Sequence, residues 1–101
     1  MTTVVAYVPD LMDRSKVAAA VPGTRFVARL DQLAEEAAGA DVVVVDLSRP
    51  GVLDHLPTRA KRLVGFASHV DRETIDRAAD AGVEVLTRNA FFRDVVLTLN
   101  R

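Results

Sequence analysis

Hydrophobic residues along the chain form five short apolar runs, which alternate with stretches whose apolar positions recur at helical spacing. The runs have the length and β-branched content of strands. The predicted strands lie in Thr2–Val8, Arg25–Arg29, Ala40–Leu47, Leu63–Ala67 and Val83–Thr87. The predicted helices are Leu11–Val21, Asp31–Ala38, Asp71–Ala81 and Asn89–Arg101, and Gly51–Arg62 carries one or two weaker turns. This alternation predicts a parallel sheet with helices on both faces.

Four consecutive valines, Val42–Val45, form the most informative segment. A near-continuous β-branched run is typical of a strand that is buried on both faces of a parallel sheet. We therefore expect Val43 and Val45 to pack on one face, and Val42 and Val44 on the other. A Pro-Gly pair soon follows and ends the element in a loop. Asp46 is thereby placed at the carboxyl end of a central strand, where open α/β sheets bind ligands.

The helical segments predict which side chains face the sheet. In the first helix we expect one face to contain Leu11, Ser15, Ala18 and Val21, with Asp13, Lys16 and Ala20 turned away. Asp31 and Asp71 are predicted N-caps, and Gly39 and Gly82 follow the ends of their helices. In the last helix one arc contains Phe91, Phe92, Val95, Val96 and Leu99, and Leu97 lies opposite it.

Length and composition limit the classes of protein that fit. The chain has 101 residues, of which 50% are hydrophobic, and this suits one domain over residues 1–101. It has no cysteine, which excludes disulfides, thiolate metal sites and cysteine nucleophiles. A net charge of −1 predicts no nucleic-acid-binding face. Because the sequence contains no membrane-spanning stretch or signal peptide, we expect a soluble cytoplasmic protein with no membrane partner.

Motifs for several kinds of chemistry are missing. The sequence contains no Gly-x-Gly-x-x-Gly, no Walker-type Gly-Lys-Ser/Thr and no Gly-x-Ser-x-Gly. His55 and His69 are isolated, which favours loop or surface positions over metal ligation. We therefore expect no enzyme activity.

Two aspartates follow neighbouring strands of the predicted sheet. In a doubly wound sheet the first and third strands lie side by side, so Asp10 and Asp46 should be close. Two carboxylates with nearby loop carbonyls could hold Mg²⁺. Alternatively, Asp10 is a helix N-cap and Asp46 accepts hydrogen bonds from loop amides. The spacing favours the second interpretation over the first and leaves both open.

The order of elements and several local strings resemble the receiver domain of bacterial response regulators. Val45–Gly51 resembles the segment with the phosphoacceptor aspartate, which would be Asp46. Val8–Asp10 falls at the acidic pair, and Phe66–His69 at the end of the fourth strand with its hydroxyl residue. Ala81–Arg88 resembles the approach to the fifth strand and its lysine. The resemblance implies a three-layer flavodoxin-like fold with a five-stranded parallel sheet of order 2-1-3-4-5.

The chain departs from the receiver pattern at most positions that support phosphorylation. Pro9 replaces one member of the acidic pair, and Ala67 stands where the family has Ser or Thr, with Ser68 next to it. Arg88 replaces the lysine, and Lys and Arg are not interchangeable at a phosphoryl site. We therefore expect a pseudo-receiver: a stand-alone signalling and protein-interaction module without a cofactor. The alternatives are an atypical receiver phosphorylated on Asp46, with Mg²⁺ at Asp10 and Asp46, and a sensor that binds a small ligand in the strand-end cleft.

Two further expectations concern contacts. Arg88 is expected to pair with Asp10 and Asp46. Its guanidinium would keep both carboxylates ionised without a metal and hold the domain in one state. The surface around Phe92, Val96 and Leu97 is expected to bind an unknown partner protein or a second copy of the chain in a weak homodimer. The resemblance raises this second expectation, because partners of receiver-like domains commonly dock on the face of the fourth helix, fifth strand and fifth helix.

Overall fold

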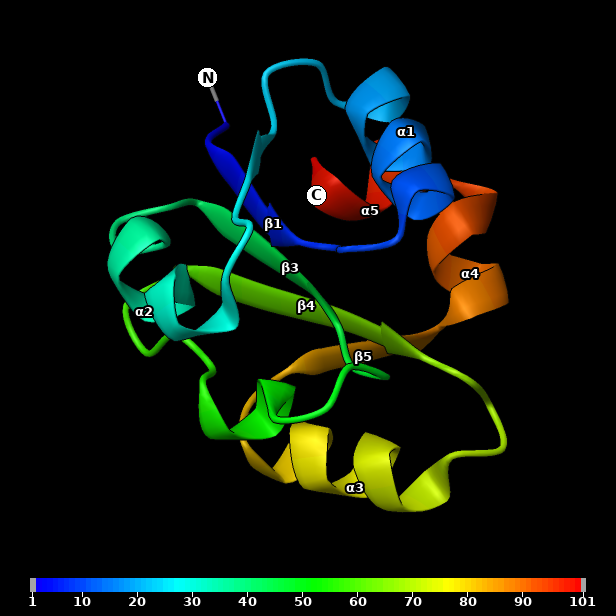
Figure 1. Cartoon of the computed structure of the whole chain (residues 1–101). Helices are drawn as coiled ribbons and strands as arrows, with labels where there is room; N and C mark the ends of the chain where they lie inside the picture. The colour runs from blue at the N-terminus through cyan, green and yellow to red at the C-terminus, as the bar shows by residue number, and fades with distance from the viewer. Residues whose placement is uncertain (1, 101) are drawn as a thin grey trace.

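A five-stranded, all-parallel sheet forms the centre of the computed structural model, which describes residues 2–100. The strands are β1 (Val4–Tyr7), β2 (Arg25–Phe26), β3 (Val42–Asp46), β4 (Arg62–Ala67) and β5 (Glu84–Thr87). Their order across the sheet is β2-β1-β3-β4-β5 (Figure 1). This is the predicted 2-1-3-4-5 order of a flavodoxin-like α/β fold, so the predicted fold is confirmed.

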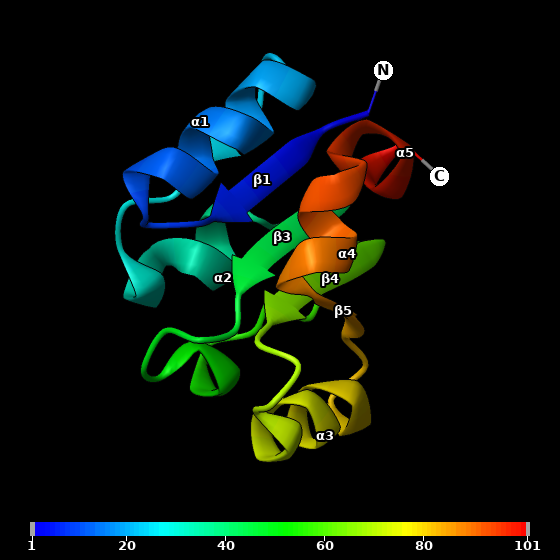
Figure 2. The same ribbon diagram turned by 90° about the vertical axis from the view of Figure 1, so that its right-hand side faces the viewer.

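Helices cover both faces of the sheet (Figures 1 and 2). They are α1 (Leu11–Ala20), α2 (Leu33–Glu36), α3 (Arg72–Asp80), α4 (Arg88–Arg93) and α5 (Val95–Leu99), with 3-10 turns η1 (Leu30–Gln32) and η2 (Val52–Asp54). One hydrophobic cluster joins the sheet to α1, α4 and α5, and the other joins it to α2, α3 and η2. No helix within residues 2–100 is long and apolar enough to cross a membrane.

The valine strand is the central element of both clusters. β3 pairs with β1 on one side and β4 on the other, and all five of its residues are buried. Val43 and Val45 belong to the cluster under α2 and α3, whereas Val42 and Val44 belong to the cluster under α1, α4 and α5. The predicted alternation is therefore confirmed, and Asp46 lies at the end of a strand that is covered on both faces.

Helix α1 presents a different face to the sheet from the one predicted. Leu11 is 75% exposed, whereas Val17 is fully buried and Asp13 is only 4% exposed. The apolar pattern had assigned Asp13 to the solvent side. Burial of this carboxylate is tolerated because it forms an ion pair with Arg88, a residue that is distant in the sequence.

Only one of the two predicted N-caps is confirmed. Asp71 accepts a hydrogen bond from the Thr74 backbone N–H at 3.3 Å, and α3 follows it. Asp31 lies inside the turn η1, and its carboxylate pairs with Arg29 at 2.8 Å. The prediction for Asp31 was wrong because a neighbouring guanidinium engages its side chain, and α2 begins only after Gln32.

The predicted last helix is broken into α4 and α5. At Asp94 the backbone leaves the helical region, with φ −152° and ψ 81°, and the Asp94 carboxylate accepts a hydrogen bond from Leu97 N–H at 3.0 Å. Aspartate competes in this way with helical hydrogen bonding, so it ends one helix and caps the next. Phe91 and Leu99 are nevertheless fully buried, as predicted, whereas Leu97 is 63% exposed.

Candidate functional site

Charged side chains gather at the carboxyl ends of three strands. Asp10 follows β1, Asp46 ends β3 and Arg88 follows β5. Since β1 pairs directly with β3 in parallel, Asp10 and Asp46 lie at the same edge of the sheet. Both carboxylates act on Arg88 through their charge and help to raise the pKa of its guanidinium. The residues predicted for this edge therefore form one electrostatic cluster with Asp13 and Arg49, which pair with Arg88 and Asp46; we call it the carboxylate cluster.

The carboxylate of Asp46 is buried and already engaged. Its Oδ1 atom accepts hydrogen bonds from the Ser48 backbone N–H at 3.0 Å and from the Ser48 hydroxyl at 2.6 Å. Its Oδ2 atom lies 3.5 Å from Nε of Arg49, whose side chain is 38% exposed. Asp46 thus stabilises the turn that leaves β3. This agrees with the second interpretation from the sequence, in which Asp46 accepts hydrogen bonds from loop amides.

Asp10 is the N-cap of α1. Its Oδ1 atom accepts hydrogen bonds from the backbone N–H groups of Met12 at 2.9 Å and Asp13 at 3.0 Å. The hydrogen bond from the Asp13 backbone N–H is the main cause of the lowered pKa of the Asp10 carboxyl. The charges of Arg49 and Arg88 lower this pKa by less. Asp10 is exposed and remains an anion that organises the first turn of α1.

Arg88 pairs with Asp13 and forms no direct ion pair with Asp10 or Asp46. Its Nη2 atom donates to Oδ1 of Asp13 at 2.8 Å, and the Asp13 side chain is only 5% exposed. This hydrogen bond is the main cause that raises the pKa of Arg88. The expected partners were wrong because Asp10 is occupied as a cap and Asp46 is held by its own turn.

Aromatic rings form one wall of the cluster. The Phe66 ring stacks on Phe91 with centroids 4.8 Å apart, and Phe92 meets both rings edge-on. The guanidinium carbon of Arg88 lies 5.3 Å from the Phe66 centroid and 5.2 Å from the Phe92 centroid. Arg88 is therefore held from two sides, by a carboxylate and by aromatic faces. Phe92, predicted as part of an interaction surface, is half-buried and belongs to this wall.

Ala67 and Ser68, which were expected to stand at the receiver's hydroxyl position, contribute little to the cluster. Ala67 is 1% exposed and offers only a methyl group. Ser68 is exposed, and its Oγ accepts a long hydrogen bond of 3.4 Å from the Val70 backbone N–H. No hydrogen bond within residues 2–100 joins Ser68 to Asp46.

The Asp10 and Asp46 carboxylates fit a magnesium ion poorly. Each has one oxygen that accepts two hydrogen bonds, and the second oxygen of Asp46 lies beside the Arg49 guanidinium. A divalent cation there would have to displace or repel a positive side chain. Within residues 2–100 no group of three or more His, Cys, Asp or Glu side chains is arranged to hold a metal ion.

Sequence reasoning missed two members of the cluster: it placed Asp13 on the solvent side of the first helix, and it gave Arg49 no role. Arg49 lies three residues after Asp46 in a loop, and a loop has no hydrophobic periodicity from which the direction of a side chain can be predicted. Asp13 did carry a signal, because Asp13, Val17 and Ala20 recur at helical spacing on one side of α1. An acid in line with apolar positions on a helix indicates a buried charge that needs a cationic partner.

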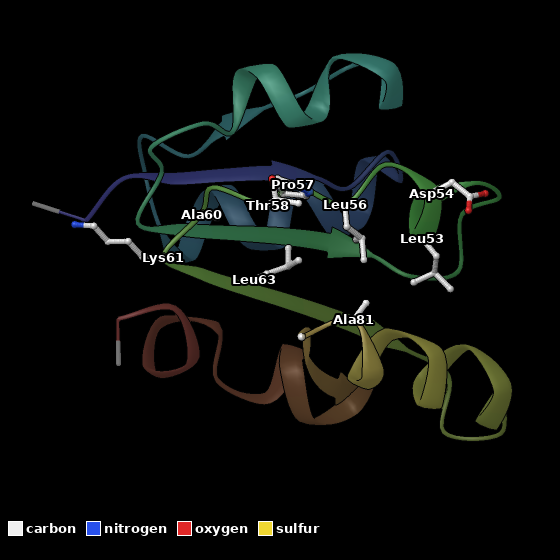
Figure 3. Close-up of a pocket in the computed structure, with 10 residues that line it drawn as sticks. Leu53, Asp54, Leu56, Pro57, Thr58, Ala60, Lys61, Leu63 and Ala81 are labelled. Atoms are coloured by element: carbon white, nitrogen blue, oxygen red, sulfur yellow. The ribbon is translucent and has the colours of Figure 1, made fainter.

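A cavity of about 480 Å³ lies along the crossover between β3 and β4 (Figure 3). The crossover between β3 and β4 contributes Leu53, Leu56 and Ala60 to its lining. Strand β4 contributes Leu63, and the end of α3 contributes Ala81. The cavity arises because this crossover contains only the short turn η2, which covers less of the sheet than a full helix would. Neither Asp10, Asp46 nor Arg88 lines this cavity, so it is separate from the carboxylate cluster.

In comparisons with protein-family models, curated proteins and solved structures, the chain shows no match.

Proposed function

We propose that this protein is a receiver-like signalling module that binds a partner protein in one fixed state, in the cytoplasm, and does not pass through a phosphorylation cycle. The observation that carries the proposal is the placement of Arg88. By the receiver resemblance this residue takes the place of the lysine, yet its guanidinium bonds to Asp13 and packs against Phe66 and Phe92. A cation held in this way is not free to follow a phosphoryl group on Asp46.

The surroundings of Asp46 support the same proposal. Phosphoryl transfer needs an accessible carboxylate oxygen and donors that stabilise the charge that develops on the phosphoryl oxygens. Here Oδ1 accepts two hydrogen bonds from Ser48, and the side chain is 3% exposed. Loss of one stabilising donor typically costs about 10²–10³ in rate. The substitutions at Ala67 and Arg88 and the poor fit of a metal would together make the reaction very slow.

Incubation with acetyl phosphate and Mg²⁺, read by intact mass, tests this proposal. We expect no stoichiometric gain of one phosphoryl group on the wild-type chain. The matched control is Asp46→Asn, which corrects for adventitious modification at other sites. A gain in the wild type that Asp46→Asn abolishes would replace the proposal with the alternative of a working, atypical receiver.

The partner is proposed to dock on α5. Leu97 is 63% exposed and Val96 is 47% exposed, and the two residues are adjacent. A single exposed leucine is ordinary, but a pair on one short helix gives an apolar contact that a partner or a second copy can cover. The break at Asp94 sets the direction of α5 and therefore determines which of its side chains face outward.

A further inference from the structure

A second cavity opens at the carboxyl ends of β4 and β5, beside the carboxylate cluster. Its volume is about 410 Å³, within the range of about 300–1,000 Å³ that small-molecule sites occupy. Two segments form it: the loop after β4, and the end of β5 with α4. The lining residues are Ser68, His69, Thr87, Arg88, Asn89 and Arg93.

The side chains that line this cavity are polar or positively charged, and none of them is acidic. The lining contains two guanidiniums, an imidazole, two hydroxyls and a carboxamide, and no aspartate or glutamate. Among the residues that the structure describes, no carboxylate pairs with Arg93, which is exposed at the end of α4. Arg93 and Asn89 are four residues apart on the helix and so lie on the same side of it. The cavity therefore offers hydrogen-bond donors and positive charge.

We propose that this cavity binds, without covalent reaction, an oxyanion group of a small polar ligand: a phosphate or a carboxylate. Guanidinium groups match both oxyanions through paired N–H donors, and Arg93 supplies a charge that no described carboxylate neutralises. Asp46 does not line the cavity, so the bound anion would be separate from the phosphoacceptor position. The inference goes beyond the proposed function and stands whether or not a partner docks on α5.

Arg88 connects this cavity to the carboxylate cluster. Its side chain is 41% exposed and lines the cavity, while its Nη2 atom donates to Asp13. An anion in the cavity and the Asp13 carboxylate would therefore share one guanidinium. Removal of the Asp13 charge should strengthen anion binding, and a gain in affinity cannot result from misfolding.

Backbone amide NMR titrations with sodium phosphate and, separately, with sodium acetate test the proposal, each against sodium chloride at equal ionic strength. We expect saturable shifts at Ser68, His69 and Asn89 that chloride does not produce. Shifts with phosphate alone identify a phosphate ligand, and shifts with acetate as well identify a general oxyanion site. If neither anion exceeds chloride, the cavity is not an anion site and the proposal is wrong.

Charge-matched variants locate the binding. Arg93→Gln should weaken binding at least about fivefold, because it removes a charge-assisted contact. Arg59→Gln is the control, since Arg59 is also exposed but lies outside the cavity. Asp13→Asn should bind about two- to tenfold more tightly, and Asp46→Asn should retain binding. Equal weakening in Arg93→Gln and Arg59→Gln, or loss of binding in a folded Asp46→Asn, would overturn the proposal.

Discussion

Arg88 and Asp13, 75 positions apart in the chain, meet in an ion pair of 2.8 Å that joins the start of α4 to the buried face of α1. The pair lies at the edge of the sheet where β3 ends in Asp46 and β5 ends before Arg88. It engages the guanidinium through Asp13, and the Asp46 charge also acts on it and helps to raise the pKa of Arg88. The positions of Arg88 and Asp13 at this edge are therefore stabilised by their own ion pair.

Truncation of Arg88 should destabilise the fold more than loss of an exposed partner would. Arg88→Ala leaves the Asp13 carboxylate buried without a partner and removes the packing on Phe66 and Phe92. We expect a loss of about 1–3 kcal/mol in the free energy of unfolding, measured by urea denaturation. Arg29→Ala breaks an exposed pair with Asp31 and should cost less than about 1 kcal/mol.

A double-mutant cycle on the same pair separates the interaction from its surroundings. Asp13→Asn alone should cost less than Arg88→Ala, because the remaining guanidinium is partly exposed and can be hydrated. We expect the two changes together to cost less than the sum of the single changes, by about 0.5–3 kcal/mol. Strict additivity would mean that the observed contact contributes nothing to stability.

Gly65 permits close packing between β4 and its neighbours. A Cβ atom built there would lie 2.8 Å from Cγ and Cδ1 of Leu47 and 3.0 Å from Cγ1 of Val83, both of which are buried. Gly65→Ala should therefore destabilise the protein by about 1–3 kcal/mol through overpacking. In a Leu47→Ala background the added methyl group should cost less, and an unchanged cost would argue against this clash.

Stability at acidic pH should depend on Asp41. A hydrogen bond from the Thr3 backbone N–H, and then one from Lys61, lower the pKa of this carboxyl below its usual value of 3.8. The folded state thus gains stability from Asp41 above pH 3.8 and loses it as the pH falls through the lowered pKa. We expect the stability difference between the wild type and Asp41→Asn to narrow in acid.

Denaturation of these two proteins at several pH values between 7 and 2 measures the effect of Asp41. Lys61→Gln provides the comparison, because it keeps the Thr3 hydrogen bond and should retain most of the pH dependence. A difference between the wild type and Asp41→Asn that stays constant across this range would contradict the assignment.

Self-association through α5 should depend on Leu97. We expect solution mass to rise with protein concentration in the wild type and to stay at the monomer value in Leu97→Glu. Leu11→Glu is a matched control, because Leu11 is 75% exposed on α1, outside the α5 surface. A wild-type chain that is monomeric at every concentration leaves only a foreign partner for this surface, and an intact dimer in Leu97→Glu would move the interface elsewhere.

Local patterns in the sequence determined the individual strands and one helix cap. The strand order was expected from the strand–helix alternation of the whole chain and from the receiver resemblance, because no single segment specifies which strands pair. The alternate burial of Val42–Val45 and the cap at Asp71 follow from short-range periodicity and turn chemistry, which a single segment carries within itself. The position of Asp46 at a strand end followed from the same signals. These features could be predicted because neighbouring residues settle them.

The partners of the charged residues were decided only by tertiary structure. Asp13 and Arg88 lie on different helices. Their contact depends on which face of α1 packs against the sheet. The break at Asp94 likewise depends on a side chain that competes with helical hydrogen bonds, against a hydrophobic pattern that continues through it. An isolated segment cannot specify such contacts, because an ion pair is set by three-dimensional distance and by the solvent that burial removes.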